Sequence, residues 1–220
     1  MLEPPLLVTF AVAQVFGLLA VIFIIMAAVE DNNNTVVSPL VDNAIPRFVW
    51  HPVLMSIGLV YLFGCSAVIY RVLRFMEKLH AKIIHAGIHF TALVLALVGL
   101  TFAIQFKTAL NFQHFSSIHG LFGLITVILF ATQWLISIPV FLWPKAPDKI
   151  RAPGMAVHIC LGIAVFLSAA VTTFTGLNSK SPATKTSEAY YKTSAFFYIF
   201  YVFVIFFMVT LKEYKRPPDY

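Results

Sequence analysis

The chain alternates between long apolar stretches and short polar connections. A stretch of about 18 or more predominantly apolar residues is long enough to cross a bilayer as a helix. Six stretches meet that condition, and they run approximately over Leu6–Val29, Phe48–Tyr70, Ile83–Gln105, His119–Trp143, Met155–Thr175 and Ser194–Leu211. The pattern therefore predicts an all-α membrane protein with six transmembrane helices.

The connections between these segments are too short to fold on their own. The longest contain turn-forming residues, at positions 31–34, 144–148 and 178–182. No internal repeat is visible along the chain. We therefore expect a single transmembrane domain that covers residues 1–220.

Composition excludes the main soluble classes. Hydrophobic residues make up 60% of the 220, and charged residues only 11%, whereas a soluble domain has about 25% charged residues. This excludes a soluble globular protein and a disordered one. The net charge of +6 is more typical of membrane orientation than of nucleic-acid binding, which we do not expect.

Lysine and arginine are divided unequally between the two sides of the membrane. Ten lie on the side of the N-terminus, the second and fourth loops and the C-terminus, and five lie on the other side. The positive-inside rule then places both termini in the cytoplasm. A possible glycosylation sequence at 33–35 falls on the opposite side, close to a helix end, and receives little weight. The sequence is compatible with the plasma membrane and with the membranes of endosomes, lysosomes and secretory vesicles.

Five of the seven histidines lie in apolar segments, where an ionisable side chain is costly and indicates function. His51 and His119 begin helices that enter from the non-cytoplasmic side. His85 and His158 lie near the starts of helices that enter from the cytoplasmic side. Two histidines near each face, on four successive helices, match what two six-coordinate b haems require. For any one of them, the alternative is a neutral imidazole bonded to a neighbouring helix.

The other histidines carry less weight. His80 and His114 fall in predicted loops with polar neighbours, where a solvated side chain is expected. His89 occupies the position four residues after His85. Because His85 matches the depth of His158 better, we expect His85 to be the ligand and His89 to support it or simply to be buried.

Small residues and an alternative metal also bear on this interpretation. Gly58, Gly123 and Gly162 each follow a candidate ligand by one or two helical turns, which would let a flat macrocycle approach the backbone. The alternative is ordinary small-residue helix packing.

A zinc site would need three or four ligands at one point, and the division of the histidines between two faces disfavours it.

A cationic cluster is expected beside the cytoplasmic histidines. Lys78, Lys82 and His85 share one face at the start of the third helix, and Arg151 precedes the fifth helix on the same side. Such a cluster suits an anionic reductant or haem propionates. The alternative is simple positive-inside charge.

Four of these segments resemble the cytochrome b561 family. Residues 50–55, WHPVLM, resemble its HPxxM segment, and residues 82–85, KIIH, resemble its KxxH segment. Residues 117–120, SIHG, are similar to its SxH segment. His158, with Leu-Gly three positions later, matches its fourth histidine region. The likeness covers roughly residues 48–175.

The resemblance implies a six-helix homodimer with two b haems in a core formed by the second to fifth helices. The non-cytoplasmic haem would be held by His51 and His119, and the cytoplasmic haem by His85 and His158. Ascorbate would give up one electron and a proton at the cytoplasmic face. The electron would then cross both haems to an acceptor, monodehydroascorbate or a ferric chelate.

The resemblance also assigns candidate substrate residues. By position, Lys78, Lys82 and Arg151 match the family's ascorbate-binding residues, and Phe106 matches the aromatic residue of the opposite-side substrate site. The next position is often histidine in the family and is Lys107 here. Lysine attracts anions but is a poor proton relay near neutral pH, so the identity of the acceptor stays open.

Two other functions remain possible on the residues alone. A histidine-lined transporter or channel would be expected to show broken helices or inverted repeats near the midplane, and the sequence contains no such helix pair. A haem-handling membrane protein without turnover would bind the cofactor without being reduced by ascorbate.

Overall fold

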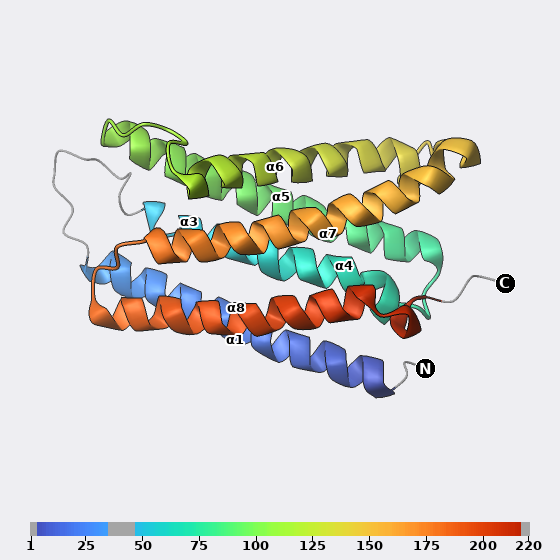
Figure 1. Cartoon of the computed structure of the whole chain (residues 1–220), viewed down its shortest axis with the longest axis horizontal. Helices are drawn as coiled ribbons and strands as arrows, with labels where there is room; N and C mark the ends of the chain where they lie inside the picture. The colour runs from blue at the N-terminus through green and yellow to red at the C-terminus, as the bar shows by residue number, and fades with distance from the viewer. Residues whose placement is uncertain (1–3, 35–46, 217–220) are drawn as a thin grey trace.

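The structure is a computed structural model that describes residues 4–34 and 47–216, and it contains all six expected spans as helices (Figure 1). The spans are α1 (Pro4–Asn34), the continuous run α3–η2–α4 (His51–Ser56, Ile57–Leu62 and Phe63–Val72), α5 (Lys78–Ala109), α6 with η3 (Ile118–Ser137 and Ile138–Leu142), α7 (Asp148–Ser179) and α8 (Lys185–Thr210). A short 3₁₀ helix, η4 (Lys212–Tyr214), follows α8. The described part of the chain contains no strand, so the all-α prediction is confirmed. The possible glycosylation sequence lies partly outside the described residues.

Several helices begin earlier than their apolar segments. α5 begins at Lys78, α7 at Asp148 and α8 at Lys185, because an apolar run marks only the part of a helix that lies in hydrocarbon. The start of α8 has its own local cause. The Thr184 side chain accepts a hydrogen bond from the Ser187 backbone N–H at 3.0 Å, in a reciprocal capping box.

The helices pack as three antiparallel pairs. α1 lies along α8, the run α3–η2–α4 lies along α5, and α6 lies along α7 (Figure 1). The described chain begins and ends at the same end of the bundle. We call that end the inner end, after the predicted orientation, and the opposite end the outer end.

A buried tyrosine joins α8 to the second span. The Tyr201 hydroxyl donates a hydrogen bond of 2.6 Å to the carbonyl oxygen of Tyr61 in the π-helical segment η2. A Cβ atom on Gly64 would lie 2.5 Å from that hydroxyl, and one on Gly17 would lie 2.7 Å from the Tyr61 ring. Both glycines are therefore needed to let α1 and α8 approach the second span.

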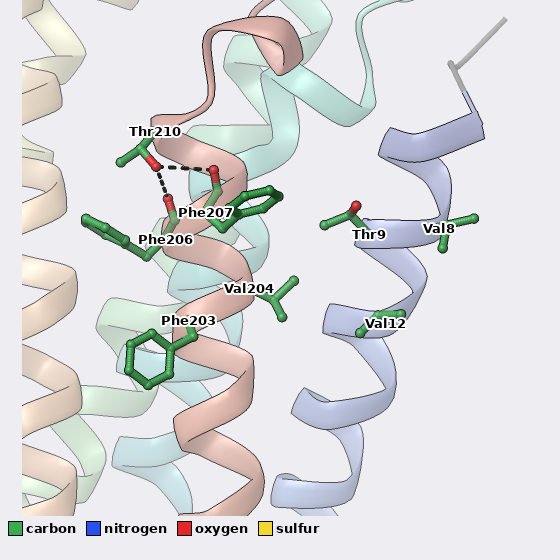
Figure 2. A pocket seen from close by; sticks show the side chains of 8 residues that line it. All are labelled: Val8, Thr9, Val12, Phe203, Val204, Phe206, Phe207 and Thr210. Carbon is green, nitrogen blue, oxygen red and sulfur yellow. Dashed lines mark hydrogen bonds between the residues drawn. The ribbon is translucent and has the colours of Figure 1, made fainter.

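An apolar groove separates α1 from α8 near the inner end (Figure 2). Its volume is about 590 Å³. The Thr210 hydroxyl points back to its own helix and donates to the carbonyl oxygen of Phe206 at 2.9 Å. The groove is lined by Val8, Thr9, Val12, Phe203, Val204, Phe206, Phe207 and Thr210. None of these side chains titrates, and the groove is not part of the candidate site.

A buried carboxylate holds the outer end together. Asp31 is only 1% exposed. It accepts hydrogen bonds from Lys180 Nζ at 2.5 Å, from the Ala183 backbone N–H at 2.8 Å and from the Tyr191 hydroxyl at 3.0 Å. The last turn of α1 is thereby tied to the α7–α8 connection and to α8.

We expect Asp31→Ala to destabilise the fold strongly. Removing one partner of a buried ion pair leaves the other charge uncompensated and typically costs about 3–5 kcal/mol. Thermal unfolding of the detergent-purified chain measures the effect. Glu188→Ala is the control, because it breaks the exposed Glu188–Lys192 pair and should change the midpoint little. Equal shifts of the unfolding midpoint in the two variants would contradict the stabilising role assigned to Asp31.

Candidate functional site

The structure brings the four candidate histidines together as two pairs. At the outer end, the imidazole of His51 on α3 faces that of His119 on α6, with ring centroids 6.2 Å apart and planes at 83°. At the inner end, His85 on α5 faces His158 on α7, also at 6.2 Å, with planes at 69°. The pairs are the ones expected from the sequence, and all four side chains are half-buried.

Each ring of the outer pair is turned by a hydrogen bond to another helix. His51 Nδ1 lies 2.8 Å from the carbonyl oxygen of Gly99 on α5, and His119 Nδ1 lies 3.0 Å from that of Thr172 on α7. A carbonyl oxygen only accepts hydrogen bonds, so both Nδ1 atoms carry the proton. The tautomer assigned from these partners leaves each Nε2 with a lone pair.

The inner pair is oriented in the same way. His85 Nδ1 donates to the carbonyl oxygen of Ser66 on α4 at 3.0 Å, and the Ser66 hydroxyl donates to the His85 carbonyl oxygen at 3.0 Å. His158 Nδ1 lies 3.0 Å from the Ser137 hydroxyl on α6. Sequence analysis missed both serines, because nothing near them in the chain marks them as partners of a distant imidazole.

The geometry of both pairs fits a metal that takes two opposed nitrogen donors, as haem iron does. A metal–nitrogen bond of about 2 Å, plus roughly 1 Å from the nitrogen to the ring centre, puts two such rings about 6 Å apart. A hydrogen bond from the other ring nitrogen is the usual support for a metal-bound histidine. Within residues 4–34 and 47–216, no cluster of three or more His, Cys, Asp or Glu side chains forms, so the arrangement offers nothing that resembles a tetrahedral zinc site.

An apolar cleft adjoins the inner pair. It lies between α6, η3 and α7, has a volume of about 340 Å³ and includes His158 and Gln133 in its lining. The Phe141 ring lies 5.2 Å from the His158 ring at one side of it. An apolar cleft beside an imidazole suits the edge of a flat hydrophobic macrocycle.

The glycines singled out in the sequence serve helix packing. A Cβ atom on Gly58 would lie 2.8 Å from the Ala92 carbonyl oxygen, so Gly58 lets η2 approach the backbone of α5. Cβ atoms on Gly123 and Gly162 would meet side chains of the neighbouring helix at 3.1 and 3.2 Å. Small-residue packing, the alternative weighed above, accounts for these contacts.

A different glycine lies against a candidate ligand. A Cβ atom on Gly176 would lie 2.5 Å from His119 Cε1 and 2.9 Å from its Nδ1. Gly176 therefore leaves the space in which the His119 ring stands. Sequence analysis missed it, because it lies on α7 and is far from His119 along the chain.

His89 lies beside the inner pair without belonging to it. Its ring is 4.6 Å from that of His85, at 90°, and 4.7 Å from that of Phe63. The side chain is buried, and its Nδ1 has no hydrogen-bond partner among the described residues. His85, rather than His89, faces His158, as the matching depths predicted.

The three predicted cytoplasmic cations gather at the inner end. Lys78 and Lys82 lie in the first turns of α5, and Arg151 lies in the first turn of α7. Lys82 Nζ donates to a backbone carbonyl oxygen of η3 at 3.0 Å, and Arg151 forms an ion pair with Asp148. Lys82 interacts electrostatically with Lys78, Arg151 and also Lys145, which the sequence did not single out.

The two predicted outer substrate residues end α5 near the outer pair. The Phe106 ring stacks on Phe48 with centroids 4.1 Å apart and planes at 10°. Phe48 in turn stacks on the His51 imidazole at 5.6 Å and 9°. Lys107 Nζ donates to the carbonyl oxygen of Gln113 at 3.1 Å. Phe48 is a further residue that sequence analysis missed, although its place three residues before His51 was a usable signal.

Six apolar spans and two oriented imidazole pairs, one near each end, define a multi-span membrane protein with two sites suited to axial metal coordination. The chain belongs to the cytochrome b561 family. The family description "Eukaryotic cytochrome b561" matches residues 50–183, more than half of the chain and a range that includes all four histidines. Membership of this family implies haem b as the cofactor.

Similar proteins come from several vertebrates. The plasma membrane ascorbate-dependent reductase CYBRD1 of Xenopus tropicalis is 33% identical over 189 residues, which cover 81% of this chain and 67% of the relative. The lysosomal membrane ascorbate-dependent ferrireductase CYB561A3 of Rattus norvegicus is 35% identical over 141 residues, 63% of this chain and 55% of the relative. The transmembrane ascorbate-dependent reductase CYB561 of Sus scrofa is 30% identical over 179 residues, 78% of this chain and 71% of the relative.

We expect Gly176→Ala to lower the haem content of the chain, because the added methyl group displaces the His119 ring. Haem per chain, measured by visible absorption of the purified protein, reports the effect. Gly87→Ala is the matched control, since a Cβ atom there meets nothing within 4 Å. Full haem content in both variants would show that the ring has room to move.

Proposed function

We propose that this chain carries single electrons across a membrane, from ascorbate at the inner end to an acceptor at the outer end. The observation that carries the proposal is the pair of oriented imidazole sites at the two ends of one bundle. Family membership and the reductase names of the relatives support it over a transporter or a haem-handling protein.

The proposal includes two haem b groups, one for each imidazole pair. His51 and His119 would hold the outer group, and His85 and His158 the inner one. Iron held between two imidazoles supplies reversible one-electron oxidation and reduction. The chain's own contribution is to fix the four rings by their Nδ1 hydrogen bonds and to surround them with apolar helices that exclude water.

At the inner end, Lys78, Lys82 and Arg151 would bind ascorbate, which is an anion near neutral pH. Their positive charge raises its local concentration beside the inner pair. Ascorbate gives up one electron and one proton there and becomes monodehydroascorbate. Arg151 also forms an ion pair with Asp148, and Lys82 lies within electrostatic reach of Lys78 and Arg151.

At the outer end, Phe106 and Lys107 would contact the acceptor, monodehydroascorbate or a ferric chelate, which takes up one electron. We propose that residues 1–220 act as one domain in a homodimer, with the inner end and both termini in the cytoplasm. The relatives named above belong to plasma membranes and lysosomal membranes, and we propose one of these membranes for this chain.

The function is tested by a visible absorption spectrum of the purified chain before and after addition of ascorbate. We expect two low-spin haems that ascorbate reduces. His119→Ala should remove mainly the outer haem and His158→Ala mainly the inner one, because each variant loses one of the two imidazoles that would hold that haem. His80→Ala, which changes an exposed histidine, should keep both. A haem-free, ascorbate-inert preparation from haem-replete cells would refute the proposal.

The cationic cluster is tested by the rate of reduction. We expect Lys78→Gln combined with Lys82→Gln to slow reduction by ascorbate about tenfold at low salt, since attraction of an anion into a charged site contributes 10-fold or more to such rates. Haem content should not change. Lys212→Gln, at an exposed lysine of the inner end, is the control. Unchanged stopped-flow kinetics in the double variant would show that these lysines only orient the chain in the membrane and do not bind ascorbate.

A further inference from the structure

The apolar groove between α1 and α8 is narrow at its deep end and wide at the inner end of the bundle. Deeper in the membrane the two helices are in contact. There the Phe16 and Phe200 rings stack with centroids 5.3 Å apart, and the Ser194 hydroxyl donates to the Ala20 carbonyl oxygen at 2.8 Å. Toward the inner end the helices diverge (Figures 1 and 2). The groove is therefore a wedge that opens toward the membrane surface.

The side chains along the groove face outward from the protein. Val8 on α1 is 62% exposed and Phe203 on α8 is 67% exposed. At this depth the surroundings are hydrocarbon, so an apolar lining needs an apolar occupant. A volume of about 590 Å³ lies within the range of about 300–1,000 Å³ that is typical of ligand sites. The shape and the lining suit a lipid acyl chain.

A buried tyrosine marks the wide end of the groove. The Tyr214 hydroxyl on η4 lies 3.0 Å from the Thr9 hydroxyl on α1, and its ring lies 6.2 Å from that of Phe207 on α8. Thr9 and Phe207 both line the groove. These contacts fix η4 directly beside the groove, at the level where the helices leave the hydrocarbon.

The segment that contains η4 is basic. Lys212 and Lys215 are both exposed, and residues 212–216 contain three basic side chains against the single carboxylate of Glu213, a net charge of +2. Arg71 adds a further cation from the second span, because its guanidinium donates to two carbonyl oxygens at the C-terminal end of α8. Positive charge therefore lies beside the wide end of an apolar groove.

This combination matches an amphipathic ligand with a negative head group and a long apolar tail. The proposed orientation places the inner end in the cytoplasmic leaflet, which is the leaflet that holds anionic lipids. Basic pockets between transmembrane helices on that side are known to hold anionic head groups. A second copy of this chain would cover the apolar lining, but it would bring a like charge against the same lysines.

We propose that the groove binds one anionic phospholipid of the cytoplasmic leaflet. One acyl chain lies between α1 and α8, and the phosphate head group lies at Lys212 and Lys215. The bound chain fills the wedge where the two helices do not touch, and so supports α1 against the rest of the bundle. The site is on the helix pair that carries none of the four candidate histidines, so it does not depend on the proposed electron transfer.

The head-group contact is tested by native mass spectrometry of the delipidated full chain in detergent. The probes are dioleoylphosphatidylserine, which is anionic, and dioleoylphosphatidylcholine, which has the same acyl chains and no net charge. We expect the wild type to bind the serine lipid about tenfold more tightly, because two lysines attract its head group. Lys212→Gln combined with Lys215→Gln should remove most of that preference. Lys149→Gln, at an exposed lysine of α7 at the same end, is the control.

The acyl-chain contact is tested by filling the groove. Val12→Trp should weaken binding of both lipids, because the indole ring occupies the space of the chain. Val15→Trp is the matched control, since Val15 lies on the same helix and is 56% exposed but does not line the groove. Reduction by ascorbate should be unchanged in all of these variants, because none of them alters either histidine pair.

Several outcomes would overturn the inference. One is equal binding of the two lipids by the wild type, and another is an undiminished preference in the double lysine variant. A third is a Val12→Trp variant that separates a dimer into monomers while lipid binding persists, which would show that a second copy occupies the groove. Each of these results leaves the test of electron transfer by ascorbate unaffected.

Discussion

The hydrogen bond between each histidine Nδ1 and a neighbouring helix is the interaction on which the rest of the structure depends. Inside a bilayer no water is present to satisfy a polar group, so each imidazole must find its partner within the protein. His51 on α3 bonds α5, and His85 on α5 bonds α4. His119 on α6 bonds α7, and His158 on α7 bonds α6. The same four bonds therefore join the helices in pairs and hold His51 opposite His119 and His85 opposite His158.

The two histidine pairs have different surroundings. At the inner end, the Lys82 side chain donates a hydrogen bond to η3 and lies near other cations. The site is therefore positively charged and suits an anionic electron donor. At the outer end, an aromatic stack of Phe48 and Phe106 lies against His51. The pair α1 and α8 carries none of the four candidate histidines. It braces the bundle through Tyr201 in the middle and Asp31 at the outer end.

The sequence predicted those features that arise from local chemistry. Hydrophobic runs located the six spans, because a lipid-exposed helix must be apolar along its length. His51, His85, His119 and His158 stood out because an ionisable side chain is rare in such a run. Their pairing followed from depth alone, since helix length fixes which residues lie near which face. The helix starts were less accurate, because polar first turns lie outside the hydrocarbon.

Only the tertiary structure decided how the rings are held and what lies against them. Ser66, Ser137 and Gly176 gain their roles from helices that are distant in sequence, and hydropathy carries no information about which faces meet. The sequence by itself determined that this protein spans a membrane and places two histidines near each face. The fold determined which group each imidazole Nδ1 bonds and which aromatic rings stack on His51, because both depend on contacts between helices.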